Sequence, residues 1–585
     1  MVLALVGCED TAPVPIPTPQ GTPSIPATPT SSPPCLAVPR DLWEEERGFF
    51  ATLQRDHPAC PVGQALDSSQ ALTWLRSGRS QIAIVSGQSP EQGAELVRTV
   101  PFVLVVHVTS PFDDVPLTWL RDIFQGGGRN RVVVSGDGMA ARELLGIDHL
   151  ASNAVHTSSW EEAKGLVARD RRALALLPWQ VVDFHVRALA IDGQRMTPQG
   201  LESYPYVRRW WLVGSLEEYP ETYQALREGL AYEPGALVSL VAVGDVMLGR
   251  GVGRLIAANS PAYPFFLTQG LTGQADVAFA NLECSLTSRG VPQGAIAFRA
   301  RPQAAEGLSY AGFDVLSLAN NHTDDYGEEG LLDTLDRLDE EGIAYVGVRR
   351  DVSEAHSAVT MEVQGLTIAF LAYNHIEPRY DGAAEDIGGP MWLEPEVVYE
   401  EVRQAHDEAD FVVVSFHWGT EYVMVPDDFQ REVARRVVEA GADLVLGHHP
   451  HVIGGAAFLD EGFAAYSLGN FVFDQSWSVE TMQGLMLHSL IDAHGLKQVR
   501  LIPVQIEAGQ PQVLPWPEAR SVLADLFQVT EGLGGLPSGS DTRIEDAEQG
   551  AHLELDWATE LDDRVNALHF GAQQWAMKKW MGEMR

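Results

Sequence analysis

The apolar positions of the chain form two patterns that alternate along most of its length. Short apolar runs bounded by polar residues, such as residues 80–87 (SQIAIVSG) and 101–110 (PFVLVVHVTS), predict buried strands. Residues 158–172 (SSWEEAKGLVARDRR) instead have the spacing of an amphipathic helix that begins at Ser158 or Ser159. Strands and helices that alternate in this way predict an α/β fold built in layers.

From about residue 238 onward, the apolar runs end in polar or histidine-bearing loops. Runs of this kind are residues 275–287 (ADVAFANLECSLT), 313–327 (FDVLSLANNHTDDYG), 409–422 (ADFVVVSFHWGTEY) and 441–452 (GADLVLGHHPHV). Helical patterns lie between them. The alternation predicts a second α/β domain, whose functional groups gather where the strands end.

Length and charge narrow the picture further. At 585 residues the chain is too long for one hydrophobic core, and we expect two or three domains. The balance of 40 basic against 80 acidic residues gives a formal net charge of -40. A surface of this sign repels phosphate backbones and anionic lipids, which argues against nucleic acid as a partner.

The N-terminus predicts a lipid anchor. Residues 5–8 (LVGC) have the form of a bacterial lipobox with Cys8 as the lipid attachment, although the basic and most of the apolar part of such a signal are missing. A short apolar terminus with a chance cysteine is the alternative. Residues 9–35, rich in Pro, Thr and Ser, predict an extended linker after the 1–8 segment. We therefore expect an extracytoplasmic protein that touches the membrane only through its lipid anchor.

Two further cysteines fit the same compartment. Cys35 and Cys60 can pair in an oxidising environment, although the sequence does not give their geometry. No later apolar run is long enough to span a bilayer.

Residues 36–232 resemble the type 2 periplasmic solute-binding fold, in particular its phosphate-binding branch. The resemblance is carried by residues 106–127 (VHVTSPFDDVPLTWLRDIFQGG), which match positions that support the fold. The ligand-binding loops of that family are only hinted at by residues 135–144 and by Ser68 and Ser69. What this module binds is open, and a small oxyanion is the candidate ligand. The alternative is a degenerate binding domain kept as a spacer or a protein-docking module.

Eight side chains of the second module follow apolar runs and include the donor types that bind divalent metals. They are Asp245, Glu283, Asn320, Asn321, His322, His417, His449 and His451. If the runs are neighbouring strands, these side chains converge on one rim, and their mixture of oxygen and imidazole donors suits Mn, Fe or Zn. The spacing of His449 and His451 predicts two rings on one side of an extended segment, with His448 on the other side.

Seven motifs of the second module resemble the CapA-type poly-gamma-glutamate capsule biosynthesis family, within the calcineurin-like metallophosphoesterase superfamily. In order they are GDVMLGR (244–250), ANLECSLT (280–287), FRARP (298–302), LANNHTDDYGEEGLLDTL (318–335), HWGTEY (417–422), GADLVLGHHPHV (441–452) and YSLGNFVFD (466–474). The resemblance implies a metallophosphoesterase-like layered α/β sandwich over residues 238–515. Residues 516–585 form a C-terminal extension with helical patterns.

The resemblance also implies a site with two divalent metal ions. Its ligands are Asp245, Glu283, Asn321, His417, His449 and His451. His322 is the catalytic histidine, Asn281 is the alternative to Glu283, and Asn320 stands where the superfamily has glycine. Two departures, Met247 in place of a histidine and ANLEC in place of a second aspartate motif, leave open whether one metal position is weaker, differently ligated or empty.

Other polar residues of the motifs have a functional and a structural interpretation. Arg299 would orient an anionic substrate, or it is a solvated surface arginine. Glu421 and Tyr422 would support His417 from outside its ligand shell. Asp474 would cap a turn near the rim, and Cys284 is expected to be a small buried residue.

Three functions compete on this evidence. The first is a metal-dependent hydrolase of the cell envelope that cleaves a phosphoester or related bond during synthesis or export of an anionic extracellular polymer. The second is a scaffold with a structural or vestigial metal site, which binds the polymer or its synthase complex. The third is a solute-sensing receptor that acts through residues 36–232.

Overall fold

The computed structural model describes residues 33–88, 93–110, 112–198, 203–232, 235–350, 358–376 and 389–537. Cys8, most of the expected linker and residues 538–585 of the expected C-terminal extension lie outside the described residues. Within the described part of the chain, no helix combines the length and apolar character needed to cross a bilayer.

The chain divides into two compact units that cut across the boundary expected near residue 232. The first unit holds the described residues up to Val85, the segment that ends at Glu95, and Trp211–Gly229. The second unit holds Leu96–Trp210 together with the described residues from Leu230 onward. The chain passes between the units along two strands, β4 (Glu95–His107) and β10 (Val207–Gly214).

The first unit is a small α/β layer. Its strands are β1 (Leu36–Pro39), β2 (Val62–Ala65) and β3 (Ile82–Ser86), and β1 pairs in parallel with both neighbours. Its helices are α1 (Arg40–Glu45), α2 (Arg47–Asp56), α3 (Ser68–Arg76), the short η2 (Leu216–Glu218) and α7 (Pro220–Leu230). Cys35 and Cys60 form a disulfide with 4.8 Å between their Cα atoms, as the sequence allowed.

The second unit begins with a further α/β layer. Its strands are β5 (Asp114–Val115), β6 (Arg131–Ser135), β7 (Val155–Thr157), β8 (Ala173–Pro178) and β9 (Val186–Ile191). Its helices are α4 (Leu117–Gln125), α5 (Met139–Leu145), α6 (Trp160–Arg169) and η1 (Trp179–Val181). The helix expected over residues 158–172 is α6, and Ser159 caps it by accepting a hydrogen bond from the Glu162 amide.

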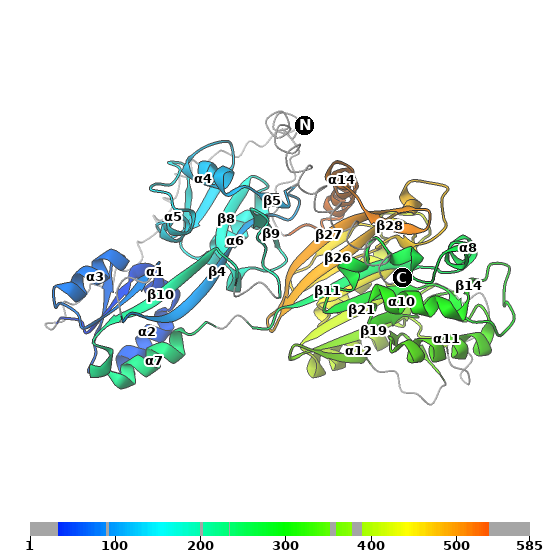
Figure 1. The fold of residues 1–585 in the computed structure, drawn as a ribbon, viewed down its shortest axis with the longest axis horizontal. Coiled ribbons are helices and arrows are strands. Elements are labelled where there is room, and N and C mark those ends of the chain that lie inside the picture. Colours follow the sequence, from blue (N-terminus) through cyan, green and yellow to red (C-terminus); the bar gives the residue numbers. More distant parts are fainter. Residues whose placement is uncertain are drawn as a thin grey trace, which may run out of the picture. The chain divides into compact units, whose positions relative to one another are not determined.

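The rest of this unit contains two large sheets (Figure 1). The strands of the first sheet run in the order β16 (Ala344–Val346), β15 (Val315–Ser317), β12 (Val277–Leu282), β11 (Val238–Val246), β26 (Gln483–Asp492), β27 (Gly495–Glu507), β28 (Gln510–Val513), and β25 (Asn470–Val472) also pairs with β11. Those of the second run β18 (Val359–Val363), β19 (Leu366–Asn374), β21 (Phe411–His417), β22 (Leu444–His448), β24 (Phe463–Ala465), β23 (Ala456–Phe458).

Helices and short strands complete this part of the unit. The helices are α8 (Arg250–Ala258), α9 (Gln269–Thr272), α10 (Ala305–Ala311), α11 (Gly327–Glu341), α12 (Pro395–Glu408), α13 (Asp428–Glu439), α14 (Trp516–Gly532), η3 (Tyr263–Phe265), η4 (Pro302–Ala304) and η5 (Glu480–Met482). Two short pairs are β13 (Ser285–Leu286) with β14 (Arg299–Ala300), and β17 (Val348–Arg349) with β20 (Gly389–Pro390).

The two sheets face each other across one apolar core, and helices cover their outer faces. Phe279 on β12 stacks on Phe370 of β19, with 5.9 Å between the ring centroids. Buried side chains of α8, α10 and α11 pack on the first sheet, and those of α12 and α13 pack on the second. Every residue of β11 and β21 is buried because both faces of each sheet are covered. The alternation of strands and helices predicted these α/β layers, and their arrangement is the layered sandwich that the family resemblance implies.

The parallel pairing brings the carboxyl ends of the central strands to one edge. Asp245 on β11 lies opposite Asn281 on β12 and Asn470 on β25. His417 on β21 lies opposite His448 on β22. Polar residues that are far apart in the sequence therefore meet at the ends of buried strands.

Candidate metal centre

Asp245 is the hub of a buried polar cluster at this edge. Its Oδ1 accepts a hydrogen bond from Asn281 Nδ2 at 2.9 Å and lies 3.1 Å from His448 Nδ1. Its Oδ2 lies 3.2 Å from His451 Nδ1 and 3.3 Å from the His449 amide nitrogen. Burial raises the pKa of Asp245, but the hydrogen bonds and charges of His448 and His451 outweigh burial and hold the pKa well below its usual range.

Glycine precedes Asp245 because the strands approach closely there. A Cβ on Gly244 would lie 1.9 Å from the Gly469 carbonyl oxygen, closer than any real contact. The Asp245 amide donates to that same carbonyl at 3.0 Å. The Gly-Asp pair of the first motif therefore fixes where the Asp245 carboxylate lies.

Glu283 and Asn281 enter the cluster from the end of β12. Glu283 is fully buried, and its Oε1 lies 3.6 Å from His451 Nε2 and 3.9 Å from His322 Nε2. Asn281 Nδ2 reaches Glu283 Oε2 at 3.4 Å. Asn320 donates from Nδ2 to Asn281 Oδ1 at 3.0 Å, so it contacts the cluster through Asn281.

His417, at the end of β21, meets Asn321, which lies in the turn after β15. His417 Nε2 lies 2.9 Å from Asn321 Oδ1, and because an amide oxygen only accepts, Nε2 carries the hydrogen. The other ring nitrogen, Nδ1, is then an acceptor and lies 3.4 Å from Asn281 Nδ2. Burial, assisted by the charge of His449, lowers the pKa of His417 well below its usual value, so the ring is neutral.

The expectation of an extended segment through His449 and His451 is wrong. Strand β22 ends at His448, and His449 and His451 have φ angles of 93° and 58°, in the left-handed region that non-glycine residues rarely adopt. The two rings nevertheless lie together, with 5.8 Å between their centroids, because this turn directs both inward. His448 contacts the cluster through Asp245, as expected for a residue outside the ligand shell.

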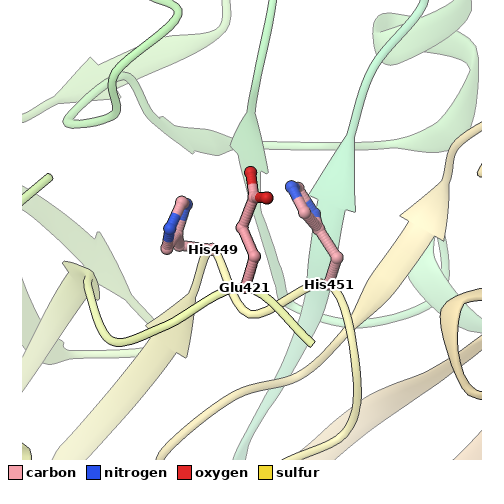
Figure 2. A group of neighbouring side chains, drawn as sticks. All are labelled: Glu421, His449 and His451. Carbon is pink, nitrogen blue, oxygen red and sulfur yellow. The ribbon is translucent and has the colours of Figure 1, made fainter. Parts of the chain in front are cut away.

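Glu421 lies in a different place from the one we expected. We expected it to support His417, but its carboxylate lies beside His449 and His451, and one donor atom of each residue falls within 4.8 Å of the other two. Figure 2 shows the carboxylate between the two imidazole rings. Asp245, Glu283 and His417 form a second group with the same spacing. Glu421 is exposed, whereas the other five residues are buried.

His322 forms a pair with an aspartate that the sequence analysis missed. His322 Nδ1 lies 2.7 Å from Asp325 Oδ2, and the ring stacks on Phe298 with 3.9 Å between the centroids. Asp325 Oδ2 also accepts a hydrogen bond from the Phe298 amide at 2.6 Å. The spacing of three residues between His322 and Asp325 was the available signal.

The structure favours the surface interpretation of Arg299. This arginine is exposed on β14, and its guanidinium lies over the Tyr326 ring at 4.6 Å. The cation nearer the cluster is Arg250, which pairs with Asp474 at 2.8 Å and lies 5.1 Å from the Phe298 ring that stacks on His322. Arg250 belongs to the first motif, in which only Asp245 and Met247 were singled out.

Three further residues complete the surroundings. Asn470, also missed, lies with its Oδ1 3.0 Å from His451 Nδ1. Asp474 accepts the Gly251 amide hydrogen at 2.8 Å at the start of α8, as a capping residue does. Cys284 is a buried free thiol, as expected, and burial raises its pKa to about 12.

The donor set fits a divalent cation at the Glu421, His449 and His451 group. Imidazole nitrogen and carboxylate oxygen are the ligands that Zn, Mn and Fe share in proteins. Buried Asp245 and Glu283 beside these residues add negative charge, which favours a cation. The fold and these side chains thus define a layered α/β protein with a candidate metal centre at the strand ends.

Comparison with known proteins identifies the family. The family model for the bacterial capsule synthesis protein PGA_cap matches residues 239–475. The chain is 32% identical over 284 residues to the capsule biosynthesis protein CapA of Bacillus anthracis, covering 47% of this chain and 69% of that protein. It is 32% identical over 273 residues to the PGA biosynthesis protein CapA of Bacillus subtilis, covering 46% and 72%. The chain therefore belongs to the bacterial capsule synthesis protein family, and the resemblance of the second module to it is confirmed.

One match to a solved structure covers the N-terminal third of the chain's length. It is the ABC-type phosphate transport receptor from Vibrio cholerae, with 18% identity and a TM-score of 0.29, covering 33% of this chain and 92% of that chain.

Proposed function

We propose that the chain is a metal-dependent hydrolase of capsule polymer biosynthesis, which cleaves a phosphoester or a related bond in an anionic polymer or its precursor. The observation that carries this proposal is the convergence of six residues from four separate motifs into two adjoining groups of metal donors. The names of the Bacillus relatives, which refer to capsule and PGA biosynthesis, support the polymer as the biological context.

Different residues of the chain have different roles in the proposed reaction. Glu421, His449 and His451 would hold a divalent cation, whose Lewis acidity would activate water near neutral pH and withdraw charge from the bond that breaks. His322, held by Asp325 at 2.7 Å, donates a proton to the leaving oxygen from its Nε2. Arg250 attracts the anionic substrate toward the centre, in the role first considered for Arg299. Glu283 lies between the two histidines, with its Oε1 3.9 Å from His322 Nε2 and 3.6 Å from His451 Nε2, and adds negative charge beside both rings.

The proposed location is the outer face of the cell membrane, with a lipid anchor on Cys8. The disulfide between Cys35 and Cys60 supports it, because such bonds persist in oxidising compartments. The net charge of -40 means that an anionic polymer or its synthase complex would be met through bound cations. A small oxyanion at the N-terminal module belongs to the same proposal.

A scaffold that binds polymer without cleaving it is the second candidate. It is favoured by Met247, which stands where a ligand histidine is expected and whose sulfur accepts a hydrogen bond from the Gly249 amide instead. Such a protein would keep a structural cation or none.

Hydrolysis of model substrates distinguishes the two candidates. The full chain is stripped with chelator and assayed on aryl phosphate monoesters and diesters with Mn²⁺, Zn²⁺ or Fe²⁺ restored, for the wild type and His449→Ala. His494→Ala, an exposed histidine on the hairpin between β26 and β27, is the matched control. We expect turnover that returns with metal and is lost in His449→Ala alone. Folded protein that shows no turnover with any restored metal would favour the scaffold.

A further inference from the structure

The orientation of the Asn320 amide is fixed by two backbone groups. Its Nδ2 donates to the Leu282 carbonyl at 2.8 Å, and its Oδ1 accepts from the His322 amide at 3.0 Å. Rotating the amide by half a turn would place oxygen against oxygen and donor against donor. Because all these groups are buried, water could not replace the hydrogen bonds that this rotation would break.

This orientation determines that of Asn281. Asn320 Nδ2 also donates to Asn281 Oδ1 at 3.0 Å, so the Asn281 oxygen must face Asn320. The amino group of Asn281 must then face the opposite way, into the buried cluster. The two asparagines form a relay from the backbone of Leu282 and His322 to the centre of the site.

The amino group of Asn281 lies among the donors of one candidate metal group. Its Nδ2 is 2.9 Å from Asp245 Oδ1, 3.4 Å from Glu283 Oε2 and 3.4 Å from His417 Nδ1. An amide nitrogen carries two hydrogens and has no lone pair free for a cation. It therefore takes the place that a cation would take among these three residues.

The other group, formed by Glu421, His449 and His451, has the arrangement of a cation site. His451 Nδ1 lies 3.0 Å from Asn470 Oδ1, the arrangement that orients a ligand histidine and directs its Nε2 to a metal. Glu283 Oε1, on the side of the carboxylate turned from Asn281, is 3.6 Å from that Nε2. Glu421 closes the group from the exposed side.

We infer that this chain binds a single divalent cation, held by Glu421, His449 and His451, and that the Asn281 amide replaces a second one. The inference deepens the proposed function and rests on it, since it states how many cations the hydrolytic centre uses. Asn281 determines the number of bound cations, because it lies opposite Asp245.

Replacing Asn281 by aspartate tests the inference, because the two side chains have the same shape. Asn281→Asp keeps the oxygen that faces Asn320 and turns the amino group into a carboxylate oxygen among Asp245, Glu283 and His417. Asp245 and Glu283 repel the negative charge of that oxygen, and a bound cation offsets the repulsion. The experiment is a Mn²⁺ titration of the full, chelator-stripped chain, read by metal content per chain and by electron paramagnetic resonance.

The expected results differ for each variant. Wild type binds about one Mn²⁺ with the spectrum of an isolated ion, and Asn281→Asp binds about two that are magnetically coupled. Glu421→Gln weakens the single site by about 10–100-fold. Asn153→Asp, an exposed asparagine, behaves as wild type.

Each alternative outcome has a definite meaning. A coupled Mn²⁺ pair in wild type, or one ion in folded Asn281→Asp, overturns the inference and leaves the proposed hydrolase standing. If Asn281→Asp does not fold, the wild-type spectrum alone decides between one ion and two. Wild type that binds no Mn²⁺, Zn²⁺ or Fe²⁺ overturns the inference and the proposed hydrolase together.

Discussion

The contact between His322 and Asp325 gives the sharpest test of the proposed chemistry. In Asp325→Asn, the Asn oxygen can still accept hydrogen bonds from the Phe298 amide and from His322 Nδ1, so the fold and the ring position are retained. What disappears is the negative charge 2.7 Å from the imidazole. The variant therefore removes the stabilisation of a charged imidazole and little else.

The magnitude follows from the burial of the pair. Asp325 and His322 are 1% and 3% exposed, so solvent does not replace the lost interaction. A hydrogen bond to a charged group contributes roughly 1.5–3 kcal/mol, which corresponds to a fall of about 10–150-fold in kcat. KM is expected to stay within about twofold, because the lost charge acts on the imidazole during proton transfer and not on the bound substrate.

The leaving group of the substrate separates this effect from general damage. A phenolate of high pKa needs a proton to depart, whereas nitrophenolate does not, so the loss in kcat should be confined to phenyl esters. Asp324→Asn, at the neighbouring position, is the control and is expected to keep wild-type kcat. An equal fall for both leaving groups, or no fall for either, would refute the assignment of His322 as proton donor.

Three further predictions concern the stability of the chain and the binding of substrate. Cys60→Ser opens a loop with a sequence separation of 25 and should lower the unfolding free energy of its unit by about 3.5 kcal/mol, measured by urea denaturation; unchanged stability would contradict this. Burial lowers the pKa of His107 to about 4, so its stabilising contribution is complete above pH 6.5 and is lost as the pH falls toward 4. Between pH 7 and pH 4, the unfolding free energy of His107→Gln should therefore fall by up to about 3 kcal/mol less than that of the wild type. Arg250→Ala should raise KM for an anionic ester about tenfold and Arg299→Ala should not, and the reverse order would restore the first assignment.

The rule that polar residues gather where buried strands end was sufficient to predict which residues of the candidate metal groups meet. Asp245, Glu283, His417 and His451 each follow a buried apolar run, and parallel pairing within each sheet, together with the packing of the two sheets on each other, brings them to one edge. That much depends on a local pattern repeated along the chain, which a single sequence displays.

Details that depend on neighbours from other segments could not be predicted. The left-handed φ of His449 follows from its fit beneath Asp245, which no local rule implies. The direction of the Asn281 amide depends on Asn320, which lies 39 positions further along the sequence and whose own amide is held by the Leu282 carbonyl. Arg250 could not be preferred over Arg299, because both follow apolar residues in quoted motifs and only their tertiary contacts differ.

The division of the chain into compact units also differs from the module boundaries expected from the sequence. Expected module boundaries followed the change in sequence pattern, whereas Leu96–Trp210 packs with the residues from Leu230 onward. Gln498, on β27, hydrogen-bonds to the backbone of Val186 and Ala188 on β9. The local sequence around these side chains does not indicate which distant residues they contact.

The most direct test of the account is a crystal of the full chain grown with Mn²⁺ and measured for anomalous scattering. We predict a single strong peak about 2.0–2.3 Å from donor atoms of Glu421, His449 and His451, and none among Asp245, Glu283 and His417. Ordered side chains with no peak at the first group would contradict the claim that the strand ends form a metal centre.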